Sequence, residues 1–146
     1  MRVSIHTVTK TLSRNDIGLT GGHQAGITVP KVSRMLEFFP QLDATEFNPS
    51  VKLTGIDTAD GTEFLMTYIY YNGKTLGRST RNEYRLTGLT AFMRRHQATE
   101  GDVLWIERVR TSIYRLSLER MLMPRTELPQ KILLKGTWST IRKAAR

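Results

Sequence analysis

Short stretches of alternating apolar and polar residues, each ending at a turn signal, recur along this sequence of 146 residues. The clearest pair is VLWIERV (103–109) and IYRLSLER (113–120), which three polar residues join as a hairpin. Only Val32–Phe39 and Leu89–His96 show the apolar spacing of short helices. Because helices and strands do not alternate regularly, the pattern favours one mainly β, antiparallel barrel or sandwich. The seven predicted strands are 2–12, 25–29, 51–56, 64–71, 103–109, 113–120 and 131–138.

The amino-acid composition excludes several classes of site. The chain has no cysteine, so disulfide scaffolds, thiolate zinc sites and iron–sulfur clusters are ruled out. His6, His23 and His96 share no metal-ligand spacing. No apolar stretch is long enough to span a membrane, and the N-terminus does not resemble a signal peptide. We therefore expect a cytoplasmic protein that holds no metal.

Net charge indicates the kind of partner. The chain has 22 Lys and Arg against 13 Asp and Glu, a formal charge of +9. Residues 1–50 contain five basic and four acidic side chains, so nearly all the excess lies in residues 51–146. Such a field attracts polyanions, of which nucleic acid is the commonest. The alternative is a basic protein whose charge serves only solubility.

No catalytic site is recognisable in the sequence. Asp57, Asp60 and Glu63 lie close together but flank a turn at Asp60-Gly61, so we interpret them as solvated turn acids and not as magnesium ligands. Neither a nucleophile-elbow motif nor a phosphate-binding glycine loop is present. We therefore expect no catalytic residue. A self-contained magnesium-dependent nuclease and a barrel that binds RNA or single strands are the alternatives.

Two polar segments contain residue types that read DNA bases. In the first, Arg14–Lys31, glycines allow close backbone approach, and Asn15 and Gln24 can bond bidentately to adenine. Asp16 can accept a hydrogen bond from cytosine, and His23 can donate one to guanine. An ordinary loop, whose polar groups bond to its own backbone, explains the composition equally well.

The second segment, Lys74–Thr87, places four basic residues around the single acid Glu83. Arginine suits guanine, and a carboxylate suits the cytosine amino group, whereas the alternative is a solvated edge with an Arg–Glu pair. Tyr84 can pack, stack or contact a sugar. A third group, which includes Arg94 and Arg95, suits phosphates. The aromatic residues of the predicted strands are expected in the core: Phe64, Tyr68, Tyr70, Trp105 and Tyr114.

Four blocks in these regions resemble a known family. NDIGLTGGHQAGITVP (15–30), FNPSVKLT (47–54), YYNGK (70–74) and TRNEYRLT (80–87) are similar to the N-terminal effector domain of EcoRII-type restriction endonucleases. The resemblance implies a seven-stranded open antiparallel pseudobarrel with two short helices, like the plant B3 DNA-binding domains. It implies that an N-arm, Arg14–Thr28, and a C-arm, Lys74–Arg85, grip the major groove of double-stranded DNA.

The family resemblance also implies a function and its residues. The expected function is recognition of a CCWGG-type site without cleavage, for which a nuclease domain on the same parent chain would use magnesium. We expect residues 1–120 to form the pseudobarrel and 121–146 a last strand and the start of a linker. For this chain we expect no cofactor, membrane or small-molecule substrate, and a prokaryotic cytoplasmic location. The expected DNA-binding residues are Arg14, Asn15, Asp16, His23, Gln24, Thr28, Lys74, Arg78, Arg81, Asn82, Glu83 and Arg85, with Lys31, Arg94 and Arg95 on phosphates.

Overall fold

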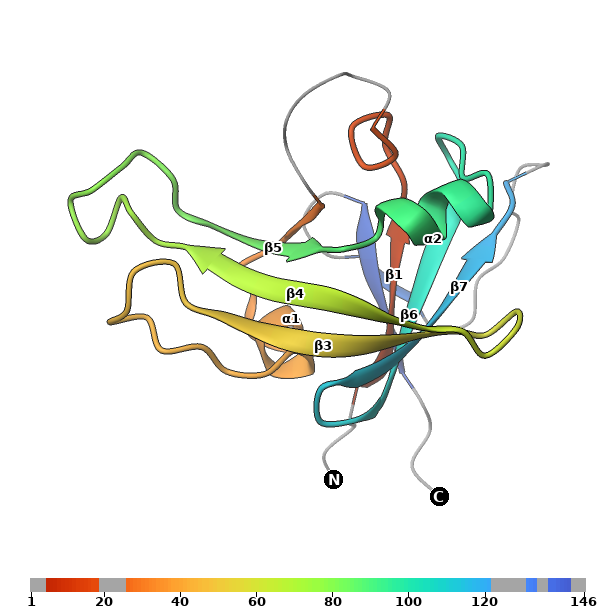
Figure 1. Cartoon of the computed structure of the whole chain (residues 1–146), viewed down its shortest axis with the longest axis horizontal. Helices are drawn as coiled ribbons and strands as arrows, with labels where there is room; N and C mark the ends of the chain where they lie inside the picture. The colour runs from red at the N-terminus through yellow and green to blue at the C-terminus, as the bar shows by residue number, and fades with distance from the viewer. Residues whose placement is uncertain (1–4, 19–25, 122–130, 134–136, 143–146) are drawn as a thin grey trace.

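A single strongly curled sheet forms the body of the molecule (Figure 1), and the computed structural model describes residues 5–18, 26–121, 131–133 and 137–142. Within this part of the chain the strand order is β2-β5-β4-β3-β7-β6-β1-β9-β8. The strands are β1 (Ile5–Thr11), β2 (Ile27–Val29), β3 (Ser50–Asp57), β4 (Glu63–Tyr71), β5 (Glu83–Thr87), β6 (Val103–Arg110), β7 (Ile113–Glu119), β8 (Lys131–Leu133) and β9 (Trp138–Arg142). The helices are α1 (Ser33–Phe38) and α2 (Thr90–Arg95).

The predicted mainly β pseudobarrel with two short helices is confirmed, with more strands than the seven expected. Strand β5 was not predicted, because it lies in a polar, basic segment in which Tyr84 and Leu86 are the apolar residues of the strand. The single strand predicted over 131–138 is instead two short strands, β8 and β9, that pair with each other. In the described residues, nine strands therefore form the sheet.

Tight turns join the antiparallel pairs at the predicted positions. Gly61, with a φ of 78°, follows Asp60 between β3 and β4, and Ser112 adopts a φ of 66° between β6 and β7. The pairing of β3 with β7 is parallel, from Thr54 opposite Ile113 to Asp57 opposite Leu116. This parallel contact joins the two antiparallel halves, so the sheet formed by the described strands is mainly antiparallel, as expected.

Apolar side chains from both halves of the sheet fill one core. Met35 and Phe38 of α1 and Phe92 and Met93 of α2 are buried within it, so each helix covers part of the curled sheet with its apolar face. Most of the predicted aromatic core residues are buried as expected, whereas Trp105 and Phe64 are partly exposed. No helix in the described ranges has the length and hydropathy needed to cross a membrane.

Strand β9 connects the end of the chain to the rest of the sheet. It pairs with β1 along Thr7–Lys10, and Trp138 is buried. The indole Nε1 of Trp138 donates a hydrogen bond of 3.0 Å to the carbonyl oxygen of Thr28 in β2. This strand is therefore an integral part of the pseudobarrel. The division at residue 120 and the linker beyond it stay predictions.

One expectation about acidic residues is wrong. Asp57 is buried and not a solvated turn acid: its Oδ2 lies 2.9 Å from Arg95 Nη2 and 2.7 Å from His96 Nε2. Burial acts to raise the pKa of Asp57, but hydrogen bonds from the Ala59 backbone and from His96 and Arg95 outweigh it and hold the pKa below its ordinary value. The carboxylate thus joins the end of β3 to α2.

Candidate nucleic-acid interface

The two predicted arms are anchored on neighbouring strands. The N-arm ends in β2 and the C-arm in β5, and these strands pair antiparallel with Thr28 opposite Arg85. Gly26 enters this ladder with a φ of 87°, and a Cβ there would collide with the Leu86 carbonyl. Figure 1 shows the turn after β1 and the loop between β4 and β5 rising on the same side of β5. One sheet edge therefore sets the spacing of the arms.

The first turn of the N-arm is held by its own polar groups. The Ser13 N–H donates to Asp16 Oδ2 at 2.9 Å, and the Asp16 N–H donates to Ser13 Oγ at 3.2 Å. Asp16 also pairs with Lys10 Nζ at 2.9 Å, and its side chain is only 8% exposed. Asp16 therefore orders the turn, while Arg14 is exposed beside it. His23 and Gln24 lie outside the described residues.

The C-arm loop is held at its base by Asn72, which is completely buried. Its side-chain amide donates to the carbonyl oxygens of Ala44 and Glu46 at 3.1 and 2.5 Å, and its Oδ1 accepts from the Asn48 N–H at 2.8 Å. The loop closes on itself where the N–H groups of Arg78 and Ser79 bond to the Gly73 carbonyl. The segment before β3 is thus fastened to the C-arm.

Beyond the loop, a chain of charges runs from the surface into the sheet. Arg81 donates to Glu83 Oε1 through Nε and Nη2 at 3.0 and 2.8 Å, and Arg85 Nη2 lies 3.2 Å from Glu83 Oε2. The Arg81 side chain is 43% exposed, whereas that of Arg85 is 4% exposed. Burial acts to raise the pKa of Glu83, but the hydrogen bonds from the two arginines leave the pKa below its ordinary value. Arg81 is therefore the most exposed of these three residues.

Aromatic rings support the exposed arginines of the C-arm. The guanidinium carbon of Arg81 lies 3.7 Å from the centre of the Tyr71 ring, and that of Arg78 lies 4.0 Å from the centre of the Phe47 ring. Tyr84 stacks on Tyr70 with ring centres 4.1 Å apart and planes at 3°. Of the three roles considered for Tyr84, packing, stacking or contact with a sugar, the structure therefore shows packing on the inner face of the sheet.

Asn82 is held by the same aromatic group. The hydroxyl of Tyr70 donates to Asn82 Oδ1 at 2.7 Å, and Asn82 is partly exposed. Lys74 is exposed on the loop, and Thr28 is exposed on β2. The structure therefore brings Arg78, Arg81, Asn82 and Lys74 to one surface, with Thr28 on the adjoining strand.

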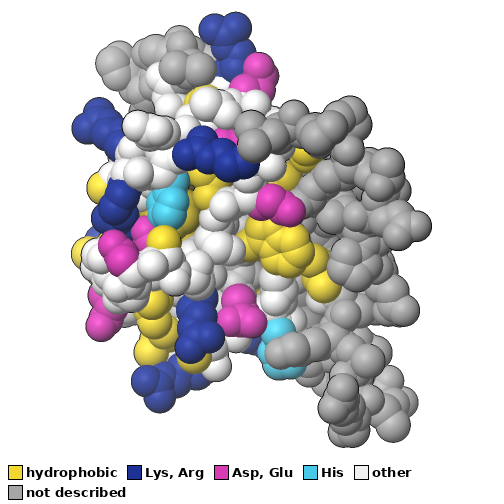
Figure 2. Space-filling view, turned by 90° about the vertical axis from the view of Figure 1, so that its right-hand side faces the viewer, with side chains coloured by type: hydrophobic (Ala, Val, Ile, Leu, Met, Phe, Trp, Pro, Cys, Tyr) yellow, Lys and Arg dark blue, Asp and Glu magenta, His cyan; other side chains and the backbone are white. Residues whose placement is uncertain are grey.

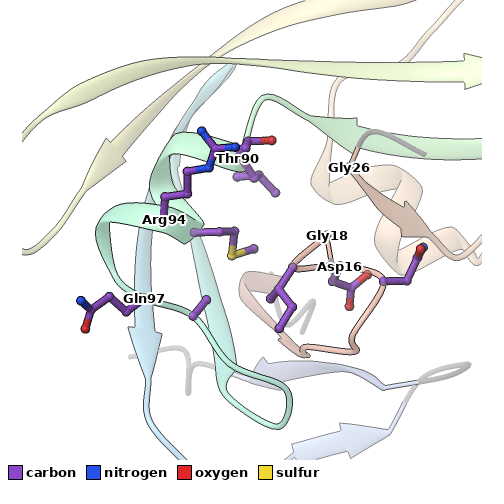
Figure 3. A pocket seen from close by; sticks show the side chains of 11 residues that line it. Asp16, Gly18, Gly26, Thr90, Arg94 and Gln97 are labelled. Atoms are coloured by element: carbon purple, nitrogen blue, oxygen red, sulfur yellow. The ribbon is translucent and has the colours of Figure 1, made fainter. Parts of the chain in front are cut away.

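A pocket of about 280 Å³ separates the N-arm from α2 (Figure 3). Asp16, Gly18 and Gly26 line one side of it and Thr90, Arg94 and Gln97 the other. Arg94 is exposed at this edge and forms no ion pair with a described residue. Arg95, by contrast, forms an ion pair with the buried Asp57. Lys31 is exposed and follows β2 in the chain. Of the three predicted phosphate contacts, Arg94 shares this pocket with the N-arm.

Other arginines bind the protein itself. Arg108 donates to the carbonyl oxygens at the end of α1, and Arg120 donates to the Gln97 and His96 carbonyls and pairs with Asp102. Figure 2 shows basic and acidic side chains interspersed on the described part of the face that carries α2, β6 and β7. The +9 charge therefore does not make every face a polyanion-binding surface.

The described residues hold no group of three His, Asp or Glu side chains arranged to bind a metal ion. The three acidic residues considered in the sequence differ in exposure: Asp57 is buried, whereas Asp60 and Glu63 are exposed. Three residues that support the C-arm were not predicted from the sequence: Phe47, Tyr71 and Asn72. All three lie in the FNPSVKLT and YYNGK blocks, which could have marked them as candidates. The sequence does not show what their side chains contact.

The curled sheet with two arms belongs to a known architectural class. The structure matches that of the Arabidopsis FUS3–DNA complex with a TM-score of 0.57 and 16% sequence identity, over 82% of this chain and 98% of that chain. The likeness shows that this chain has the B3-like pseudobarrel fold.

The particular family follows from the sequence. Residues 2–101 match the family model described as "Restriction endonuclease EcoRII, N-terminal", and the chain belongs to this family. It is also 46% identical over 81 residues to the type II restriction enzyme EcoRII of Escherichia coli, a match that spans 53% of this chain and 19% of that enzyme. These matches confirm the resemblance carried by the four blocks: the chain has a B3-like fold and belongs to the EcoRII N-terminal family.

Proposed function

We propose that this domain recognises a specific double-stranded DNA site of the CCWGG type by gripping the major groove between its N-arm and C-arm. In this proposal the domain does not cleave DNA, and a magnesium-dependent nuclease domain on the same parent chain performs that step. The chain spans about a fifth of the length of the Escherichia coli enzyme that it matches, which agrees with a recognition module within a larger enzyme.

The observation that carries the proposal is the β2–β5 ladder between the arms. Thr28 and Arg85 face each other across it, so both arms are attached to one rigid edge. A duplex can then be read from two sides of its groove without reorganisation of the sheet. Rigid placement of this kind favours specificity, because the arms lose little conformational entropy when DNA binds.

The chemistry of the C-arm suits a site rich in G·C pairs. An arginine bonds bidentately to guanine O6 and N7, and a carboxylate accepts from the cytosine N4 amino group. Arg81 is exposed and its charge is oriented by Glu83, which is itself partly exposed. In this proposal Arg81 therefore recognises guanine and Glu83 recognises cytosine. Arg85 is buried beneath them and acts through Glu83.

A gel-shift titration at about 0.1 M salt tests the proposal, with a CCWGG duplex, a scrambled duplex and the unpaired CCWGG strand, each with and without Mg²⁺. We expect at least a hundredfold preference for the CCWGG duplex and no cleavage products. Equal binding to both duplexes would disprove the specificity. Tighter binding to the single strand would indicate a stacking surface instead, and cleavage by this domain alone would establish the nuclease alternative.

A further inference from the structure

We propose that Phe47 and Tyr71 are positioning residues that hold the arginines of the C-arm in place before DNA arrives, which makes the segment before β3 part of the recognition surface. This inference rests on the proposed function and deepens it. It assigns a role to a segment outside both arms, 43–48, and it separates the residues that touch DNA from those that orient them.

The first contact is between the segment before β3 and the C-arm. Phe47 is 43% exposed, and its ring faces the Arg78 guanidinium at 4.0 Å. Burial does not explain this position, whereas a support for a cation does. Asn72 fastens the backbone on both sides of Phe47, because it bonds to the Glu46 carbonyl and to the Asn48 N–H.

The second contact lies on β4 itself. Tyr71 is the residue opposite Glu83 in the β4–β5 ladder, so its ring stands beside the Glu83 carboxylate. Arg81 lies over this ring at 3.7 Å while its Nε and Nη2 bond to Glu83 Oε1. The guanidinium is therefore fixed by a ring beneath it and by a carboxylate at one edge.

Such supports bear on affinity because a free arginine has many rotamers. Ordering a long charged side chain on binding costs conformational entropy, and a side chain that is already ordered in the free protein avoids most of that cost. The rings of Phe47 and Tyr71 do this without competing for hydrogen bonds. Arg78 and Arg81 can then use their N–H groups on DNA.

Ring removal tests the inference directly. Phe47→Leu and Tyr71→Leu keep apolar bulk but lose the ring, whereas Phe47→Tyr and Tyr71→Phe keep it. Val109→Ala is the matched control, because Val109 has nearly the same exposure, 44%, and lies at the β6–β7 hairpin. Each variant is titrated with the CCWGG and scrambled duplexes, and its thermal unfolding is measured to confirm that the fold is intact.

We expect each Leu variant to bind the CCWGG duplex about threefold to fivefold more weakly, and both ring-preserving variants and Val109→Ala to match the wild type. The double variant Phe47→Leu/Arg78→Ala should bind no more weakly than Arg78→Ala alone, because the ring acts only through that arginine. Additive losses would overturn the inference, as would unchanged affinity of both Leu variants in a protein that still prefers CCWGG.

A measurement without DNA separates this inference from the proposed function. In the free protein, NMR should show side-chain protons of Arg78 and Arg81 shifted by the adjacent rings, and the shifts should vanish in the matching Leu variants. Absent ring-current shifts would overturn the inference even if the wild type is selective. A wild type that shows these shifts but no preference between the duplexes would overturn the proposed function, and the role of the rings in recognition with it.

Discussion

Asn48 and Asn72 exchange hydrogen bonds across 24 positions of the chain: each backbone N–H donates to the other's side-chain Oδ1, at 2.8 and 3.3 Å. Asn48 has a φ of 49°, a conformation that asparagine tolerates better than most residues. This pair joins the segment before β3 to the base of the C-arm. It explains how a surface loop can hold Phe47 against Arg78.

Asn72→Ala should remove the buried amide that holds this junction. We expect a loss of about 2 kcal/mol in the free energy of unfolding, since several backbone groups lose their buried partner but lie near enough to the surface for water to replace it in part. Urea denaturation measures the change. Asn48→Gly, which permits the same backbone conformation and removes only one bond, should cost less. An equal loss in both variants would show that the Asn72 amide has no special role.

Gly73→Ala should open the C-arm loop. A Cβ at Gly73 would collide with the hydroxyl of Ser79, whose N–H also bonds to the Gly73 carbonyl. We expect a loss of about 1–2 kcal/mol in stability and a reduced preference for CCWGG. The double variant Gly73→Ala/Ser79→Gly should recover part of both, as measured by denaturation and gel shift. No recovery would mean that the collision is not the cause.

Arg81→Ala should weaken binding to the CCWGG duplex by about 1–3 kcal/mol and relax discrimination at one base pair. Arg110→Ala, an exposed arginine at the β6–β7 hairpin, is the control and should leave the base preference unchanged. Competition binding against single-substitution duplexes provides the measurement. Equal losses on CCWGG and scrambled DNA would contradict a reading role for Arg81.

Arg94→Ala should behave differently, because Arg94 lies at the edge of α2, away from the C-arm. A phosphate contact carries no sequence information, so affinity for every duplex should fall alike. The slope of log affinity against log salt concentration should fall in magnitude by about one unit. Titrations between about 50 and 200 mM salt measure this slope. A loss confined to the CCWGG duplex would make Arg94 a base reader.

Asp57→Asn should destabilise the domain in a pH-dependent manner. The folded-state pKa of Asp57 lies below the ordinary value of 3.8, so its ionised form stabilises the fold above that pH, and this contribution is lost as the pH falls through the folded-state pKa. We expect a loss of about 2 kcal/mol at pH 7, as measured by denaturation, and a difference from the wild type that shrinks as the pH falls through the folded-state pKa. Asp60→Asn, in the same turn but exposed, should have little effect.

Local sequence patterns were sufficient for much of the fold. The turn at Asp60-Gly61 and the strands on either side of residues 110–112 were predicted correctly because alternation and turn chemistry act over a few residues. The strand β5 was missed for the same reason: its core contact comes from Leu86 opposite Tyr68 on β4, and EYRLT alone does not show it. The order of the strands depends on pairings between distant segments, which no local pattern contains.

For the candidate site, the residue types, the two arms and the family could all be predicted from the sequence. Which basic residues are accessible follows from the tertiary structure. Arg81 and Arg85 are four positions apart, yet one is exposed and the other buried, because the register with β2 and β4 covers only the second. Likewise, Phe47 meets Arg78 only because Asn72 joins two distant segments, a contact set by packing and not by any local preference.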